Sequence, residues 1–107
     1  MPPPPVLTPE QRLAALEKAA AARRIRAEIK EQLKDERLTL TQLFERAGRD
    51  DVLAKLKVVS MLESMPNTGK VKARRLMRDL DISESRRIRG LGPNQRQKLL
   101  EHFGPRP

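Results

Sequence analysis

The amino-acid sequence predicts an all-α fold, in which a long N-terminal helix is followed by a small helical domain. Residues 10–37 contain neither glycine nor proline and are rich in alanine, which is typical of one uninterrupted helix. Two capping boxes, a motif that starts helices, precede apolar residues at helical spacing. Two tight breaks, at residues 66–69 and 90–93, divide the rest of the helical pattern. At 107 residues the chain is expected to form one domain with a modest core.

The N-terminal segment is predicted to be a disordered tail followed by the long helix. Residues 1–7 include four consecutive prolines, which favour an extended, polyproline-like chain. Thr8 and Gln11 form a capping box with Pro9 at the first helical position, so the helix is predicted over residues 8–37. Its apolar stripe covers only the C-terminal half and consists of Ala22, Ile25, Ile29 and Leu33. The first half is therefore expected to project away from the core.

The predicted domain, residues 38–107, begins with two helices. A second capping box, formed by Thr39 and Gln42, starts a short helix that Gly48 ends. Asp51 is expected to cap a third helix that runs to Pro66, because proline cannot continue a helix. The buried stripe of this third helix is predicted to consist of Val52, Leu56, Val59 and Leu62, with Leu53 beside it.

Two further helices complete the predicted domain. The first starts near Gly69 and directs an apolar face inward, formed by Ala73, Leu76, Met77 and Leu80. Asp81 and Ile82 then make a turn, and Ser83 is expected to cap a short helical turn. The last helix starts at Gly92 and Pro93, and its inward residues are Leu99, Leu100 and Phe103.

The charge of the chain indicates a polyanionic partner. It contains 23 basic and 14 acidic residues, which give a net charge of +9. Residues 66–107 hold eleven basic and four acidic side chains, so most of the excess lies in this part. Such an excess is typical of proteins that bind nucleic acid or an anionic membrane surface. The absence of cysteine excludes disulfides and cysteine metal sites, and the presence of only two aromatic residues argues against stacking on single strands.

Both tight breaks are flanked by cations. Lys70, Lys72 and Arg74 follow the first break, and Arg86, Arg87 and Arg89 precede the second. Backbone N–H groups of small residues can approach an anion closely, and a helix N-terminus adds partial positive charge. The break residues expected to take part in such contacts are Asn67, Thr68, Gly69, Gly90 and Gly92. We interpret the two breaks together as a clamp for a phosphate backbone.

The long helix carries a second group of basic residues, Arg23, Arg26 and Lys30. One interpretation is a solvated face crossed by ion pairs such as Arg24 with Glu28. The other is a secondary contact that follows a phosphate backbone. Both interpretations remain open at the level of the sequence.

Several segments resemble the actinobacterial integration host factors. They are residues 7–12, 16–24, 62–66 and 69–73, together with residues 83–92, which read SESRRIRGLG. The resemblance spans nearly the whole chain, and the SRRIRGLG stretch is specific to that family. Asn67 departs from the pattern, because family members often carry a glycine there. Asparagine tolerates positive φ better than other non-glycine residues, so the turn can be kept.

The resemblance implies a helix-two-turn-helix domain, which is also found in a small-subunit ribosomal protein and in some DNA glycosylases. It implies a cytoplasmic, nucleoid-associated protein that binds double-stranded DNA with little sequence preference, bends or compacts it, and supports phage site-specific recombination. A phage integrase is therefore an expected further partner. DNA contacts are expected at Gly69, Lys70 and the three arginines of SRRIRGLG, through phosphates and through an arginine in the minor groove. A monomer without cofactor or metal is expected.

Three other classes of function are less consistent with the sequence. The main alternative is a structural RNA-binding protein of ribosomal type, but the chain lacks the basic, glycine-rich tail usual in those proteins. An enzyme is not expected, because His102 is the only histidine and the acidic residues show no paired or metal-ligand spacing. A membrane-surface role is disfavoured by the few bulky apolar residues in the first half of the long helix, and no apolar run is long enough to span a bilayer.

Overall fold

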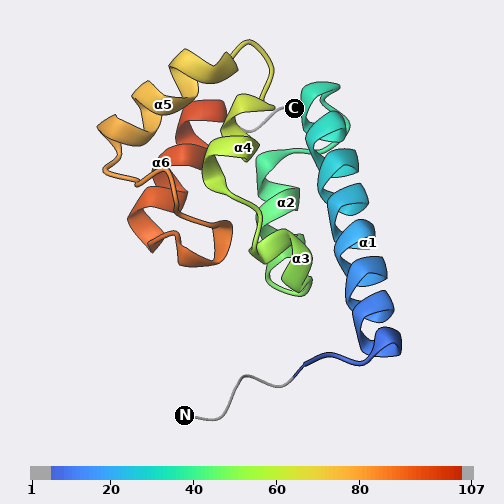
Figure 1. The fold of residues 1–107 in the computed structure, drawn as a ribbon. Coiled ribbons are helices and arrows are strands. Elements are labelled where there is room, and N and C mark those ends of the chain that lie inside the picture. Colours follow the sequence, from blue (N-terminus) through green and yellow to red (C-terminus); the bar gives the residue numbers. More distant parts are fainter. Residues whose placement is uncertain (1–5, 105–107) are drawn as a thin grey trace, which may run out of the picture.

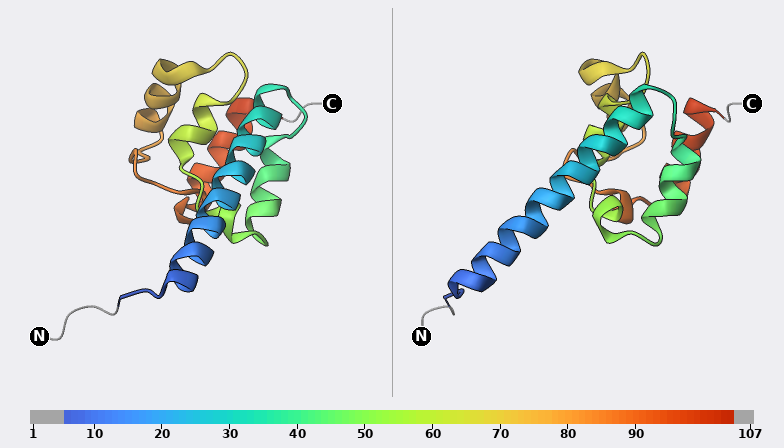
Figure 2. Two further views of the ribbon diagram at one scale, coloured as in Figure 1. Left: turned by 45° about the vertical axis from the view of Figure 1, so that its right-hand side comes forward. Right: turned by 90° about the vertical axis from the view of Figure 1, so that its right-hand side faces the viewer.

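The computed structural model describes residues 6–104 and confirms the all-α fold (Figure 1). In chain order the elements are α1 (Pro9–Lys34), α2 (Leu40–Ala47), α3 (Asp51–Ala54), α4 (Val58–Glu63), α5 (Gly69–Asp79), the short 3₁₀ helix η1 (Ile88–Gly90) and α6 (Pro93–Phe103). Helix α1 lies along one side of the domain, and its N-terminal part extends beyond the other helices (Figure 2). Within residues 6–104 no helix is both long and apolar enough to cross a membrane.

Helix α1 begins where the capping box predicts and ends three residues before the predicted end. The Thr8 hydroxyl accepts a hydrogen bond from the Gln11 N–H at 3.1 Å, and the Gln11 side chain accepts from the Thr8 N–H at 3.0 Å. The helix stops at Lys34 because Glu36 adopts a φ of 61°. The N–H of Arg37 then donates back to the Gln32 carbonyl at 2.9 Å, which turns the chain toward α2.

Burial along α1 follows the predicted stripe. Ile29 and Leu33 are buried, and Ile25 packs partly buried against the same core. Leu13 and Leu16, in contrast, are 58% and 59% exposed. The first half of the helix therefore contributes little to the core. The predicted division into a tail (1–7), a long helix (8–37) and a domain (38–107) stays a proposal, and residues 1–5 of that tail lie outside the described residues.

The prediction of one helix between Asp51 and Pro66 is wrong. Two short helices, α3 and α4, occupy this region, and residues 55–57 separate them. Asp50, and not Asp51, caps α3, since its carboxylate accepts from the Val52 N–H at 3.0 Å. The second helix, α2, was predicted correctly, because its start depends on a local capping box at Thr39.

The break between α3 and α4 has a long-range cause. The Leu56 carbonyl accepts from the Ile88 N–H at 3.0 Å, and the Val58 N–H donates to the Arg86 carbonyl at 3.0 Å. These bonds flank an isolated antiparallel bridge between Lys57 and Arg87. A continuous helix would use the same backbone groups internally. Backbone pairing with residues 86–88 therefore takes the place of helical hydrogen bonds at residues 56–58.

A single apolar core joins the C-terminal half of α1 to the remaining helices. Its fully buried members come from every part of the domain and include Leu33, Leu43, Met61, Leu62, Met77, Ile88 and Leu99. The predicted inward faces of α5 and α6 are confirmed, because Ala73, Met77 and Leu99 are buried and Leu76, Leu80, Leu100 and Phe103 pack partly buried against them. The core thus fixes both loops that flank α5, at residues 64–68 and 80–92.

Candidate nucleic-acid interface

The hairpin, residues 65–69, joins α4 to α5 in a tight turn. Asn67 adopts a φ of 60° and Gly69 a φ of 69°, so the predicted tolerance of asparagine for this conformation is confirmed. The Thr68 hydroxyl bonds to the Pro66 carbonyl at 3.2 Å and does not cap the helix. The N–H groups of Gly69 and Lys70 donate to no acceptor within residues 6–104. This helix N-terminus can therefore donate to an external anion.

Two lysines accompany these N–H groups. Lys70 and Lys72 are exposed on the first turn of α5. Lys72 Nζ lies 3.3 Å from the Asn67 carbonyl, which keeps its ammonium close to the hairpin. The opposite, core-facing side of the same helix carries Ala73 and Met77. Packing of that apolar side therefore directs the cations to the solvent.

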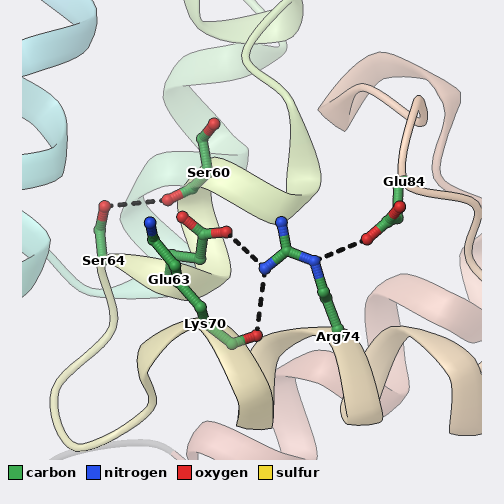
Figure 3. A network of polar contacts seen from close by, with 6 residues as sticks. All are labelled: Ser60, Glu63, Ser64, Lys70, Arg74 and Glu84. Carbon is green, nitrogen blue, oxygen red and sulfur yellow. Dashed lines mark hydrogen bonds and ion pairs between the residues drawn. The ribbon is translucent and has the colours of Figure 1, made fainter.

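Arg74 is held differently from the lysines. Its Nε donates to Glu84 at 2.7 Å and its Nη1 donates to Glu63 at 3.0 Å, so two carboxylates share one guanidinium. Figure 3 shows the three side chains converging from α4, α5 and the loop before η1. The sequence predicts Arg74 as one of the DNA-binding residues that follow the first break. The structure gives it protein partners instead.

The arginine turn, residues 84–92, is anchored by Ile88, and Leu91 near its end is also buried in the core. Ile88 is 1% exposed and sits in the core, while Arg87 and Arg89 on either side are exposed. Between Arg86 and Arg89, the apolar side chain is thus held in the core while the flanking Arg87 and Arg89 remain at the surface. The extended pairing with residues 56–58 holds the start of the turn, and η1 forms its middle.

The arginine side chains of this turn have three different environments. Arg86 is half-buried and donates to the Gly90 carbonyl at 2.7 Å. Arg87 donates to the Lys55 carbonyl at 2.6 Å. Arg89 is exposed, and within residues 6–104 no hydrogen bond or ion pair holds its side chain. Of the three, Arg89 is the most available to an external anion.

Arg89 still contributes to the local electrostatics. The Lys55 ammonium, bonded to the Asp51 carboxylate at 2.9 Å, is the main cause of a pKa of Asp51 below its usual range. The charges of Arg89 and of Lys18 on α1 lower this pKa further. Arg89 and Lys18 therefore lie close enough to Asp51 for their charges to act on its carboxylate.

The glycines of the second break serve the turn and do not offer free N–H groups. The Gly90 N–H donates to the Arg87 carbonyl at 2.9 Å, and the Gly92 N–H donates to the Gln95 side chain at 3.0 Å. A Cβ on Gly90 would lie 2.9 Å from Cδ of Arg86. Gly90 is therefore needed for the close approach of Arg86. The expectation that these N–H groups bind phosphate does not fit their internal bonds.

Gln95 is a positioning residue that sequence reasoning missed. Its carbonyl oxygen accepts from Gly92, and its amide nitrogen donates to the Asp81 carbonyl at 3.0 Å. It thereby ties α6 to both ends of the loop that contains the arginine turn. A glutamine three residues after a helix N-cap is the signal that could have identified it.

The secondary basic residues on α1 are not brought together with the hairpin as a group. Lys30, with Lys34, lines a groove whose other wall is formed by residues 63–69. Glu31, Asp35 and Glu63 line the same groove, so its charge is mixed. Arg23 is exposed and Arg26 is half-buried, and neither lines that groove. A second groove, between α5 and the arginine turn, gathers Arg74, Arg78 and Arg86.

Comparisons with known proteins match this architecture. The S13-like H2TH domain family matches residues 33–103. The chain is 57% identical over 100 residues to the integration host factor of Mycobacterium tuberculosis, a match that covers 94% of this chain and 95% of the relative. It is 55% identical over 100 residues to the integration host factor of Streptomyces coelicolor, covering 94% of each. The solved structure "Structure of sIHF bound to an 8bp palindromic DNA" has a TM-score of 0.80 and 51% identity, and covers 82% of this chain and 99% of that one.

These relatives share the long helix as well as the domain, since the matches extend over more than nine-tenths of the chain. Their shared name does not favour the alternative of a ribosomal-type protein. By its identity and coverage, the chain belongs to the actinobacterial integration host factor family, built on an S13-like H2TH domain.

Proposed function

We propose that this protein is an architectural DNA-binding protein of the nucleoid. In this proposal it binds double-stranded DNA mainly through phosphates, with little sequence preference, and bends or compacts the duplex. The observation that carries the proposal is the uncapped N-terminus of α5 beside exposed Lys70 and Lys72. A relative of the same fold, at 51% identity, has been solved bound to an 8-bp palindromic DNA.

The hairpin is the first proposed contact. The N–H groups of Gly69 and Lys70 would donate to one phosphate, and the partial positive charge of the helix end would add to the attraction. Lys70 and Lys72 would neutralise this phosphate and its neighbour. Asn67 and Thr68 would act by shaping the turn, because the side chain of Thr68 is already bonded to Pro66. Such contacts position a protein on DNA without reading the bases.

The arginine turn is the second proposed contact. Arg89 is exposed and would bind a phosphate or enter the minor groove. Arg86 and Arg87 would retain their bonds to backbone carbonyls and present their remaining guanidinium N–H groups. Gly90 and Gly92 would keep the turn narrow enough to approach the sugar-phosphate backbone of the DNA. Two contacts on one duplex would favour a bent path, because bending brings more phosphates within reach.

Further parts of the proposal concern α1 and the partners. Arg23, Arg26 and Lys30 would form a secondary contact with DNA, and the exposure of Arg23 and Lys30 supports this. We also propose a monomer located in the cytoplasm on the nucleoid, without catalytic activity or cofactor. A phage integrase would be met on shared DNA during site-specific recombination.

Fluorescence anisotropy with labelled ligands tests this proposal. Duplex DNA should bind more tightly than a single strand of the same length or a folded RNA. If five to seven phosphates are contacted, log K should fall against log salt with a slope of roughly −4.5 to −6. Preference for the folded RNA would favour the ribosomal-type alternative. A slope shallower than about −2 would contradict a contact dominated by phosphates.

A further inference from the structure

Arg74 lies at the junction of the two turns proposed to contact DNA. Its Nε is 2.7 Å from Oε1 of Glu84, and its Nη1 is 3.0 Å from Oε1 of Glu63. The same Nη1 also donates to the Lys70 carbonyl at 3.3 Å. In Figure 3 the guanidinium stands between the two carboxylates, with α4 on one side and the loop before η1 on the other.

The two carboxylates that Arg74 contacts stand at the beginnings of two different loops. Glu63 is the last residue of α4, so it precedes the hairpin. Glu84 opens the arginine turn and lies close in sequence to Arg86. Within residues 6–104, Arg74 is the one residue whose side-chain hydrogen bonds link these two loops. One guanidinium therefore ties the beginning of the hairpin to the beginning of the arginine turn.

The charge balance argues against Arg74 as a phosphate ligand. Two carboxylates already compensate one guanidinium, so the three side chains together carry a net negative charge. A phosphate that took Arg74 would leave Glu63 and Glu84 unpaired beside it, and like charges that close repel. The planar fork of arginine suits the bridging role, because its N–H groups point to two partners at once, which a single lysine ammonium does not reproduce.

We propose that Arg74 is a positioning residue that sets the separation of the hairpin and the arginine turn, so that both reach the backbone of one duplex. This inference rests on the proposed function. It assigns Glu63 and Glu84 to DNA binding although both are acidic. Electrostatics alone predicts that replacing either glutamate by a neutral residue strengthens DNA binding, since it removes negative charge near DNA. The positioning role predicts that the same replacement weakens binding. Whether replacing the glutamates weakens or strengthens DNA binding therefore distinguishes Arg74 as a positioning residue from Arg74 as a direct phosphate ligand.

The first test measures the separation of the loops without DNA. The chain has no cysteine, so spin labels can be attached to Val71→Cys, next to the hairpin, and Ser85→Cys, within the arginine turn. Both positions are exposed. Pulsed electron–electron double resonance should give one narrow distribution of label-to-label distances in the doubly labelled parent. The distribution should broaden in Arg74→Met and in Glu84→Gln. It should stay narrow in Arg75→Met, which removes an exposed arginine from the same helix. An unchanged distribution in Arg74→Met would overturn the proposal.

The second test measures duplex affinity and its salt dependence in the same variants without labels. Arg74→Met should weaken binding about five- to tenfold with little change in salt slope, since preorganisation and not a phosphate contact is lost. Arg74→Lys should not restore affinity. The Glu63→Gln/Glu84→Gln variant should also bind more weakly, despite its more positive charge. A slope reduced by about one, rescue by lysine, or tighter binding of the glutamine variant would each make Arg74 a direct ligand.

Melting separates positioning from folding. Because exposed ion pairs contribute little to stability, the Tm of Arg74→Met should lie within about 5 °C of the parent. A fall of more than about 10 °C would assign Arg74 to folding and overturn the proposal. The label distances are measured on free protein, so they report on Arg74 even if the parent failed to bind duplex DNA. That failure would refute the proposed function by itself.

Discussion

The hairpin and the arginine turn both bring cations to the surface, but their shapes have different origins. The hairpin is shaped by its backbone, through the positive φ of Asn67 and Gly69, and its lysines remain exposed. The arginine turn is shaped by its own cations, because Arg86 and Arg87 donate to backbone carbonyls at 2.7 and 2.6 Å. In the first region charge is available for a ligand. In the second, part of the charge maintains the fold, so a count of basic residues overstates what DNA can use.

The largest expected effect concerns the apolar anchor of the arginine turn. Ile88→Ala should lower the free energy of unfolding by about 2–4 kcal/mol, because it leaves a cavity in a well-packed core. Val71→Ala, beside the hairpin, is the matched control. Val71 is 72% exposed, so its truncation should change stability by less than about 0.5 kcal/mol. Urea denaturation measures both, and equal effects would show that the two regions do not differ in anchoring.

The glycines of the two regions should respond oppositely to substitution. Gly69 has a positive φ and nothing within 4 Å of a built Cβ, so Gly69→Ala should cost about 1–2 kcal/mol through backbone strain alone. Gly69→Asn should cost less, because asparagine tolerates this conformation. Gly90 needs space, since a Cβ there would meet Arg86 at 2.9 Å. Gly90→Asn should therefore cost more than Gly90→Ala. Thermal melting of the four variants would contradict the comparison if asparagine helped at both positions.

Alanine substitutions of the three arginines in the arginine turn should change stability by different amounts, depending on what each side chain contacts. Replacing an exposed arginine usually changes stability by less than about 0.5 kcal/mol. The structure changes this for Arg86 and Arg87, whose replacement by alanine should each cost about 1 kcal/mol through a lost bond to a backbone carbonyl. Arg89→Ala should change stability by less than about 0.5 kcal/mol and should mainly weaken DNA binding. Denaturation and anisotropy on the same samples check this. Equal stability losses for all three would contradict the assignment.

The parts of the fold that the sequence predicts correctly depend on local signals. The capping boxes at Thr8 and Thr39 set the starts of α1 and α2 with partners three residues away. The break between α3 and α4 could not be predicted, because Leu56 pairs with Ile88 across a large part of the chain. Apolar residues at helical spacing continue through residues 52–62, so periodicity alone predicts one helix there. In the structure Val52 and Val59 of the predicted stripe are only partly buried, while Val58 and Met61, which are outside that stripe, are fully buried.

The same distinction applies to the candidate site. Residue type and spacing identify which cations gather near the two turns, but not what each side chain contacts. Arg74 meets Glu63 and Glu84, and Arg87 meets the Lys55 carbonyl, and all these partners lie at least ten residues away. Such contacts depend on tertiary packing. Gln95 escaped notice for a related reason, since its N–H partner is local but its carbonyl partners at residues 80 and 81 are not.

The central claim is that the hairpin and the arginine turn contact one DNA duplex together. A titration of ¹⁵N-labelled protein with a short duplex, followed by NMR of the backbone amides, tests it most directly. The account predicts the largest shifts in two groups, residues 67–72 and 87–92, which move in parallel with the same Kd. Amides at the start of α1, residues 9–16, should hardly move, because this part of the helix extends beyond the other helices in Figure 2. Shifts confined to residues 23–34 of α1, with both turns unaffected, would contradict the account.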